Sequence, residues 1–350
     1  MTSMSKPLID KHLKKNKLGL TVRDYEGGMS TLCAGCGHDS VTAALVQAFW
    51  QLDLAPESAA KVSGIGCSSK TTAYFMGQSH GINCVHGRMP SVATGANAVN
   101  GDLHYIGISG DGDSLSIGFG QLAHAMRRNL NMLYIIENNG VYGLTKGQFS
   151  AAADLGTQSK KGLVNDQPPI DPCIQALTLG AGFVARAFSG DKSQLVPLIQ
   201  AGLMHKGFAL IDVISPCVTF NDHKGSTKSY AHTYKYYHPL IHTDFVADAS
   251  EITGQYDQDG AMQVTMHDGG ILNLKKTDEG YDPRDRAQAV ETLMLGDQTQ
   301  EIRTGLLYVN EDQSDIHDAN GLPDTPLNAL PYDTLNPGAS ALADLQKRYR

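Results

Sequence analysis

Short apolar runs alternate with longer amphipathic segments through the first 215 residues of the chain. The apolar runs predict strands at Lys61–Val62, His104–Ser109, Leu133–Ile136, Phe183–Ala187 and Phe208–Ile214. Apolar side chains spaced three and four apart predict helices at Ser40–Leu52, at Ser91–Asn100, through Leu115, Phe119, Leu122 and Met126, at Asp171–Leu179 and at Lys192–His205. This alternation indicates a doubly wound α/β fold with a mainly parallel sheet.

The pattern changes beyond about Tyr236. Two apolar runs, Gln263–Met266 and Ile271–Leu274, flank a turn sequence and predict a hairpin. Asp282-Pro283 predicts the start of a helix that runs to Leu295, and Gly305–Asn310 predicts one more strand. We therefore expect an N-terminal arm at residues 1–28, an α/β domain at 29–235, and a C-terminal extension at 236–350 that packs on the domain or on a partner.

Composition and charge exclude some classes of function. The 350 residues carry a net charge of −8, so no basic surface favours nucleic acid or an anionic membrane. We find neither an apolar run long enough to span a membrane nor the core of a signal peptide. The sequence predicts a soluble, cytoplasmic protein, in which six cysteines favour metal or redox chemistry over disulfides.

Polar residues follow two successive predicted strands. Gly110-Asp111-Gly112-Asp113 comes after the first, and Glu137-Asn138-Asn139-Gly140 after the second. A right-handed strand–helix–strand unit brings both ends to one sheet edge, so Asp111 and Asn139 converge. With the carbonyl of Val141 they offer the oxygen ligands that Mg²⁺ prefers, while Gly110, Gly112 and the next helix N-terminus suit a diphosphate. The alternative is an ordinary strand-to-helix turn with a solvated Asp.

Four of the cysteines are arranged as a possible metal site. Cys33 and Cys36 form a C-x-x-C pair, and Cys67 and Cys217 lie in two other predicted loops. Such a set suits tetrahedral zinc or a 4Fe–4S cluster, and spacing alone leaves both open, with Cys84 as another choice for the fourth ligand. The presence of only one close pair slightly favours iron–sulfur.

These motifs together resemble a known family. GDG followed after 25 residues by NN is similar to the Mg-diphosphate motif of thiamine-diphosphate enzymes. GDGD…IGFGQLAHAMRRN…NNGVYGLTKGQ resembles the β subunit of 2-oxoacid:ferredoxin oxidoreductases, most closely the 2-oxoglutarate type, over about residues 30–235. LCAGCGH, GIGCSSK and SPCVTFND resemble its cluster loops, which implies one 4Fe–4S cluster on Cys33, Cys36, Cys67 and Cys217, with Cys84 and Cys173 spare.

The resemblance also implies a pocket for the cofactor and substrate. The residues that it places around thiamine diphosphate are Ile65, Gly66, Cys67, Ser68, His86, Thr94, Gly110, Gly112, Asp113, Gly143 and Leu144. Lys146 in GLTKGQ is the leading candidate for the second carboxylate of a dicarboxylic substrate, with Lys70 and Arg88 as alternatives. His86 could instead be a structural histidine, and Lys146 a surface lysine. FSAAAD after Gln148 departs from the commoner Ser-Pro-Thr stretch and matches the longer 2-oxoglutarate-type chains.

The implied reaction is the coenzyme A- and thiamine-diphosphate-dependent oxidative decarboxylation of 2-oxoglutarate to succinyl-CoA and CO₂, or its reverse, with single electrons passing to ferredoxin. The chain shows one convincing cofactor domain, so the Glu that activates the aminopyrimidine is expected on an α subunit, in an (αβ)₂ assembly. The alternatives are the same chemistry on pyruvate or other 2-oxoacids, a non-oxidative thiamine-diphosphate decarboxylase or synthase, and a zinc-stabilised assembly subunit.

Overall fold

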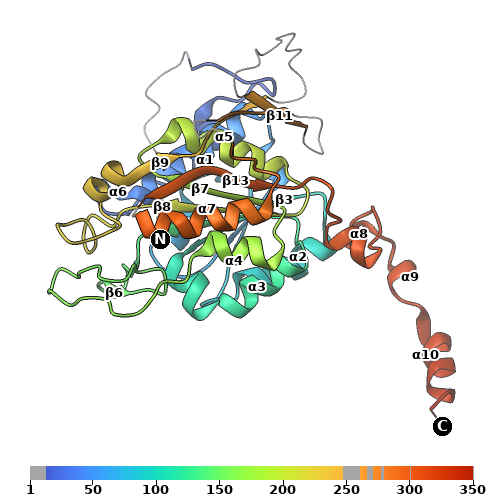
Figure 1. The fold of residues 1–350 in the computed structure, drawn as a ribbon. Helices are drawn as coiled ribbons and strands as arrows, with labels where there is room; N and C mark the ends of the chain where they lie inside the picture. Colours follow the sequence, from blue (N-terminus) through green and yellow to red (C-terminus); the bar gives the residue numbers. More distant parts are fainter. Residues whose placement is uncertain (1–12, 247–260, 266–270, 277–279, 300, 350) are drawn as a thin grey trace.

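A twisted sheet organises the computed structural model, which describes residues 13–246, 261–265, 271–276, 280–299 and 301–349 (Figure 1). Its strands follow the order β2-β1-β3-β4-β8-β7-β13-β9. They are β1 (Ala59–Ser63), β2 (His80–Asn83), β3 (His104–Gly110), β4 (Met132–Asn138), β7 (Phe183–Phe188), β8 (Phe208–Ile214), β9 (Tyr237–Pro239) and β13 (Ile302–Val309). All neighbours run parallel except β13 and β7, which confirms the predicted mainly parallel α/β fold.

The central strands are covered on both faces. Every residue of β4 and β8 is buried, which explains why these strands read as continuous apolar runs. β4 is longer than predicted, because Glu137 and Asn138 keep their pairing with Val213 and Ile214 of β8. The strand therefore carries polar residues to the edge where the candidate site lies.

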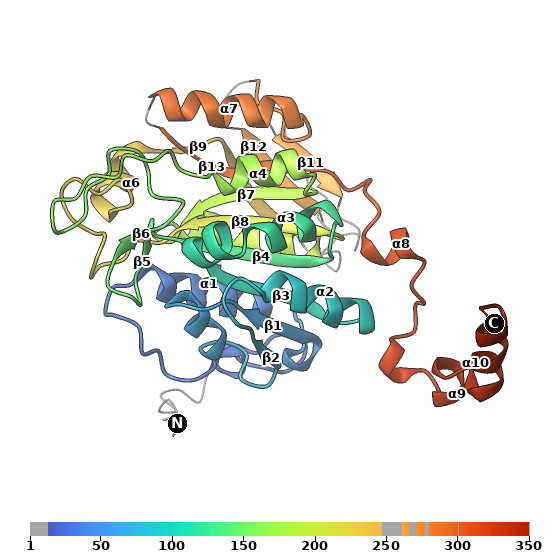
Figure 2. The ribbon, with the colours of Figure 1, turned by 90° about the horizontal axis from the view of Figure 1, so that it is seen from below.

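Helices form a layer on each face of the sheet (Figures 1 and 2). One layer holds α1 (Gly37–Gln51) and α5 (Lys192–Met204). The other holds α2 (Met89–Val99), α3 (Phe119–Arg127), α4 (Pro172–Leu179) and α7 (Arg286–Thr299). Local sequence sets the helix ends: at α4 the Asp171 side chain accepts two backbone N–H groups, and Gly180 ends the helix with φ +91°.

The helix predicted after Asp111 is interrupted. Residues Gly112–Ile117 form a π-helical turn, and α3 begins only after Gly118. A side chain at Gly118 would collide with the backbone of Gly87, so the break lets the loop after β2 pack closely against this turn. The predicted buried face is confirmed at Leu115, Leu122 and Met126.

Residues on both sides of position 236 contribute to the main sheet, because β13 pairs with β7, and β9 pairs with β13. A second sheet, β10-β12-β11, packs beside α5; its strands are β10 (Ile241–Val246), β11 (Ala261–Thr265) and β12 (Ile271–Lys276). The antiparallel β11–β12 pair confirms the predicted hairpin, although its turn falls outside the described residues. The predicted start of α7 at Asp282 was wrong: the Asp285 carboxylate accepts the N–H groups of Ala287 and Gln288, so the helix begins one turn later.

The remaining helices and strands lie at the sheet edge or near the C-terminal end of the described chain (Figure 2). They are β5 (Val141–Tyr142), β6 (Gln148–Phe149), α6 (Tyr230–Tyr236), α8 (Ile316–Asn320), α9 (Tyr332–Leu335) and α10 (Gly338–Lys347). α9 and α10 extend away from the body of the molecule (Figures 1 and 2). Among the described residues, no helix combines the length and apolarity needed to cross a membrane.

Candidate cofactor and cluster site

An oxygen-rich elbow lies where β3 and β4 end. Asp111 and Asn139 are 1% and 5% exposed. The Asn139 N–H donates to Asp111 Oδ1 at 3.5 Å, and the Ser150 hydroxyl donates to Asp111 Oδ2. Asn139 Oδ1 in turn accepts the Val141 N–H at 3.1 Å. The structure thus brings Asp111, after β3, against Asn139 and Val141, after β4. We call these three expected Mg²⁺ ligands the elbow (Asp111, Asn139 and Val141).

The electrostatics of the elbow fit a divalent cation. Burial raises the pKa of Asp111 to about 6, although the Ser150 hydroxyl, the Asn139 N–H and the more distant Lys228 ammonium oppose the rise. A bound cation would offset the desolvation of this carboxylate. The donor set of carboxylate, amide oxygen and backbone carbonyl is the hard oxygen chemistry that Mg²⁺ selects.

Glycines let the surrounding loops converge on the elbow. A Cβ at Gly112 would collide with the Tyr142 ring, and one at Gly64 would collide with the Asp113 carboxylate. A Cβ at Gly110 would lie 3.0 Å from Ser68 Oγ. Gly110 therefore faces the loop after β1, whereas close packing against Tyr142 requires glycine at position 112.

The four candidate cluster cysteines gather at the same sheet edge. A Cβ on Gly143 would lie 3.6 Å from Cys67 Sγ and 3.7 Å from Cys217 Sγ, so these two sulfurs flank one glycine of the β5–β6 loop. The Thr219 hydroxyl donates to Cys33 Sγ at 3.2 Å, and the Cys36 N–H donates to the Cys33 carbonyl at 3.0 Å. Three separate loops are thereby joined around the cysteines.

The thiols differ in environment. Cys33 is exposed, Cys67 and Cys217 are half-buried, and Cys36 is buried at the start of α1, where burial raises its thiol pKa to about 12. Cys84 lies instead beside Asp113, and Cys173 is in the first turn of α4 with its sulfur 3.7 Å from the Ala185 carbonyl of β7. In the described part of the chain, no three His, Cys, Asp or Glu side chains are gathered as closely as a single metal ion requires.

A buried polar network behind the cysteines was not predicted from the sequence. Glu137 is fully buried in β4, accepts the Thr71 hydroxyl at 3.0 Å, and lies 3.5 Å from His38 Nδ1. His38 Nδ1 is also 2.6 Å from the Ser215 hydroxyl. Burial raises the pKa of Glu137 well above its usual value and lowers that of His38 to about 4. The only sequence signal was a charged residue inside the apolar run LYIIEN.

A second unpredicted feature is a partly buried ion pair beside the elbow. Lys228 Nζ lies 3.0 Å from Asp154 Oδ2, and its side chain passes 3.3 Å from the position of a Cβ on Gly140. Burial alone would raise the pKa of Asp154, but the Lys228 ammonium and the Thr227 hydroxyl hold it below its usual range. Both residues line a cavity of about 690 Å³ that also reaches Asn138 and Arg186.

Several candidate cofactor residues have other contacts in the structure. The Asp113 carboxylate accepts the Gly87 N–H at 2.8 Å and the Ser109 hydroxyl at 2.9 Å, so it holds the loop that carries His86. His86 itself is exposed. The Thr94 hydroxyl donates to the Pro90 carbonyl inside α2. Asp113 therefore orients the loop after β2 through its carboxylate.

The substrate-pocket candidates differ in exposure. Lys146 and Leu144 are exposed in the turn between β5 and β6, Arg88 is exposed at the start of α2, and Lys70 is half-buried in the turn after Cys67. Lys146 has a φ of +80°, a left-handed backbone that side-chain-bearing residues rarely adopt. The half-buried Ile65 and Gly66 lead into Cys67 and the buried Ser68.

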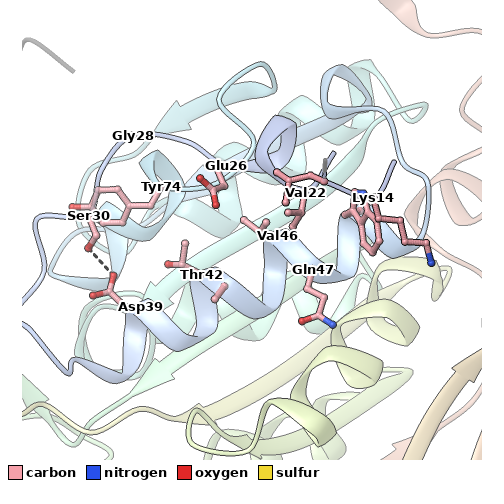
Figure 3. Close-up of a pocket in the computed structure, with 13 residues that line it drawn as sticks. Lys14, Val22, Glu26, Gly28, Ser30, Asp39, Thr42, Val46, Gln47 and Tyr74 are labelled. Carbon is pink, nitrogen blue, oxygen red and sulfur yellow. Dashed lines mark hydrogen bonds between the residues drawn. The ribbon is translucent and has the colours of Figure 1, made fainter. Parts of the chain in front are cut away.

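A separate cavity of about 490 Å³ lies between the N-terminal segment and α1 (Figure 3). Val22, Val46 and Trp50 give it an apolar wall, and the Ser30 hydroxyl donates to Asp39 at 2.6 Å at one end. None of the candidate cofactor, cluster or substrate residues lines it. The predicted site thus lies at the sheet edge and not in this cavity.

Comparison with known proteins places the fold. Residues 64–213 match the family model of the thiamine pyrophosphate enzyme C-terminal TPP-binding domain. The chain is also similar to the solved structure of 2-oxoglutarate:ferredoxin oxidoreductase from Magnetococcus marinus with 2-oxoglutarate, coenzyme A and succinyl-CoA bound. That match has a TM-score of 0.71 at 27% identity and covers 89% of this chain and 91% of the other.

Curated relatives agree with the structural match. The 2-oxoacid:ferredoxin oxidoreductase β subunit of Saccharolobus solfataricus is 35% identical over 80% of this chain and 81% of its own length. The 2-oxoglutarate synthase subunit KorB of Methanocaldococcus jannaschii is 35% identical over 63% of this chain and 81% of its own. The 2-oxoglutarate oxidoreductase subunit KorB of Mycobacterium tuberculosis is 38% identical, over 54% of this chain and 51% of its own. The chain therefore belongs to the β subunits of the 2-oxoacid:ferredoxin oxidoreductases.

Proposed function

We propose that this chain is the β subunit of a 2-oxoglutarate:ferredoxin oxidoreductase. With its α subunit it converts 2-oxoglutarate and coenzyme A to succinyl-CoA and CO₂, or runs the reverse carboxylation, and exchanges single electrons with ferredoxin. The observation that carries this proposal is the meeting of two donor sets at one sheet edge. The elbow supplies buried oxygens, and Cys67 and Cys217 flank the neighbouring Gly143. Cys33 and Cys36 join them through the Thr219 hydroxyl, which donates to Cys33 Sγ from the Cys217 loop. A non-oxidative thiamine-diphosphate enzyme would need only the first set.

The elbow fits the metal end of the cofactor. Asp111, Asn139 and the Val141 carbonyl would hold Mg²⁺ against a diphosphate, and Gly110 would let the backbone approach it. Ile65–Ser68, Gly143 and Leu144 would line the rest of the cofactor, with Gly87 and His86 held alongside by Asp113. Bound there, thiamine diphosphate supplies the electron sink for decarboxylation of a 2-oxoacid. The protein's part is to fix its position and exclude water.

Cys33, Cys36, Cys67 and Cys217 would hold a 4Fe–4S cluster, which supplies one-electron transfer. The set has only one close pair, Cys33 and Cys36, whereas a structural zinc site usually has two such pairs, and this supports a cluster over zinc. Burial of Cys36 disfavours its thiolate until a positively charged centre compensates it. Burial raises the pKa of Glu137 and lowers the pKa of His38, and both shifts favour the neutral form of the side chain. In their neutral forms the two residues add no net charge behind the cysteines.

Lys146 is the proposed partner of the second carboxylate of 2-oxoglutarate. A left-handed backbone costs a non-glycine residue about 1–2 kcal/mol, so lysine is tolerated at this φ of +80° at the expense of stability. That cost supports a requirement for its side chain at the mouth of the site. Lys70 and Arg88 remain the alternatives, and a pocket without such a cation would favour pyruvate or another 2-oxoacid.

The α subunit is proposed to supply the activating Glu and to complete a cytoplasmic (αβ)₂ enzyme. The edge strand β2 supports a partner, because all four of its residues are exposed. Next to it, Val85 is 69% exposed. Apolar side chains on an open strand edge are typical of a surface that another chain covers.

Metal analysis and turnover test the proposal. Anaerobically purified protein is expected to contain about four irons and four sulfides per chain. The isolated chain should oxidise no 2-oxoacid, and adding the α subunit should restore coenzyme A-dependent reduction of ferredoxin by 2-oxoglutarate. One zinc per chain, or turnover by the isolated chain, would refute the proposal.

A further inference from the structure

One buried side chain joins the elbow to the cysteine loops. Asn221 lies four residues after Cys217, in the segment that follows β8, and is 1% exposed. Its Nδ2 donates to the carbonyl of Asn139 at 2.8 Å, while its backbone N–H donates to the carbonyl of Cys217 at 2.8 Å. A single residue therefore bonds the main chain of a proposed Mg²⁺ ligand and that of a proposed cluster ligand.

The contact depends on the shape of the elbow. Gly140 has a φ of +73°, and a Cβ there would lie 3.2 Å from Asn221 Nδ2. This spacing is tighter than ordinary van der Waals contact, so the amide packs directly over the turn between Asn139 and Val141. The Ser226 hydroxyl donates to the Asn221 carbonyl at 2.9 Å and fixes the other side of the residue.

The same segment also meets the far end of the elbow loop. The Phe220 ring packs where Gly147 leaves no room for a side chain, with its Cβ 2.9 Å from the position that a Cβ would take. Between these two contacts, Gly143 lies against the sulfurs of Cys67 and Cys217. Residues 217–221 thus hold the loop of residues 139–147 at its start, middle and end.

We propose that Asn221 is a positioning residue that couples occupancy of the diphosphate–metal site to occupancy of the cysteine site. That these two sites bind Mg²⁺–thiamine diphosphate and a 4Fe–4S cluster rests on the proposed function. Asn221 contacts none of the atoms that are proposed to bind Mg²⁺ or the cluster. Its side chain holds the backbone carbonyl of Asn139, and its own N–H holds the loop of Cys217. Ordering one loop therefore orders the other. Such coupling is reciprocal: each ligand then binds more tightly when the other is present.

The test measures affinity for Mg²⁺–thiamine diphosphate by calorimetry on the αβ enzyme, with its cluster intact and after iron is removed with a chelator. For the wild type we expect removal of the cluster to weaken binding several-fold. Asn221→Asp keeps the shape but replaces the donor with an acceptor that repels the Asn139 carbonyl. Asn221→Asp should weaken cofactor binding to the cluster-loaded enzyme about tenfold, which is the scale of one lost buried hydrogen bond. Its cofactor affinity should then be the same with the cluster intact and with the cluster removed.

Asn129→Asp is the matched control. Asn129 is also buried, and its Nδ2 donates to the Ser314 carbonyl at 3.0 Å, but it lies at the opposite end of the sheet, where it accepts the Phe208 N–H. This variant should lose stability and keep the wild-type ratio of affinities. Asn221→Ser, which retains a shorter donor, should fall between wild type and Asn221→Asp and serves if the latter does not fold.

The EPR spectrum of the reduced cluster gives a readout that does not depend on turnover. Adding Mg²⁺–thiamine diphosphate should change the spectrum in wild type and in Asn129→Asp, and leave it unchanged in Asn221→Asp. If the Asn221 variants keep the wild-type ratio of affinities and the spectral change, the coupling role is refuted. If the wild-type enzyme itself holds no cluster or no cofactor, the proposed function fails instead.

Discussion

The elbow and the cysteine site lie side by side but are built differently. Hydrogen bonds within the elbow already fix its polar atoms, and Asp111 and Asn139 are almost inaccessible. The cysteines come from three loops and range from exposed to buried, and Cys33 Sγ accepts a hydrogen bond from the Thr219 hydroxyl. The difference indicates that the sheet preforms the diphosphate–metal site, whereas the cluster completes its own site. The predictions below challenge this contrast.

The largest effect is expected at the cysteines. Replacing Cys33, Cys36, Cys67 or Cys217 with Ala should empty the site, from about four irons per chain to none, because no preformed frame replaces a missing ligand. Cys84→Ala and Cys173→Ala are the controls and should retain the iron. Iron analysis on anaerobic protein decides the matter; retention by Cys217→Ala with loss by Cys84→Ala would reverse the assignment of the fourth ligand.

The elbow should fail separately. Asp111→Ala or Asn139→Ala should abolish measurable binding of Mg²⁺–thiamine diphosphate, since each removes a metal ligand, while the cluster spectrum persists. Calorimetry and absorption spectra of the same samples provide the two readouts. Unchanged cofactor affinity in both variants would refute the elbow as the metal site, and loss of the cluster would show that the two sites depend on each other far more than the several-fold coupling proposed through Asn221.

Removing the ion pair beside the elbow should weaken the preformed frame. Lys228→Met leaves Asp154 without its cation and should lower the free energy of unfolding by about 2 kcal/mol. This is less than the usual cost of breaking a fully buried ion pair, because water reaches the partly exposed Asp154 carboxylate. The pKa of Asp154 is held below its usual value, so the pair stabilises the fold above about pH 4, and its contribution is lost as pH falls below that value.

Thermal melts from pH 7 to pH 3 measure this effect. The wild type should lose more stability than Lys228→Met across the acid range, because the variant has no favourable pair left to lose. Lys206→Met is a useful control, since its partner Asp318 forms an exposed pair of little energetic value. Parallel curves for wild type and Lys228→Met would show that the pair contributes nothing to the frame.

The smallest effect concerns the substrate. Lys146→Gly should lower kcat/KM for 2-oxoglutarate about 10- to 100-fold, the value of a lost charged hydrogen bond, and affect pyruvate much less. Because glycine relieves the left-handed backbone at this position, the variant should melt no lower than wild type. Steady-state kinetics on both substrates with the α subunit present give the comparison. Equal losses would assign Lys146 to the cofactor or the fold.

Sequence patterns predicted the fold well where the structure is local. Buried parallel strands such as β8 produce continuous apolar runs, and a strand–helix–strand unit necessarily brings Asp111 towards Asn139. Spacing could not choose between Cys84 and Cys217, because that choice depends on which loops meet. The break at Gly118 was missed because its cause is Gly87, a residue far away in the sequence. Asn221 and the Glu137–His38 pair were missed for the same reason.

The open edge of β2 has a consequence for how the enzyme is made. Within the described residues β2 pairs on one side only, with β1, and its exposed residues end near Val85. A newly synthesised chain would present this edge to any other extended segment, including the same edge of a second copy. Production of the chain alone should therefore favour edge-to-edge aggregates, whereas synthesis alongside its α subunit would cover the edge if the partner binds there.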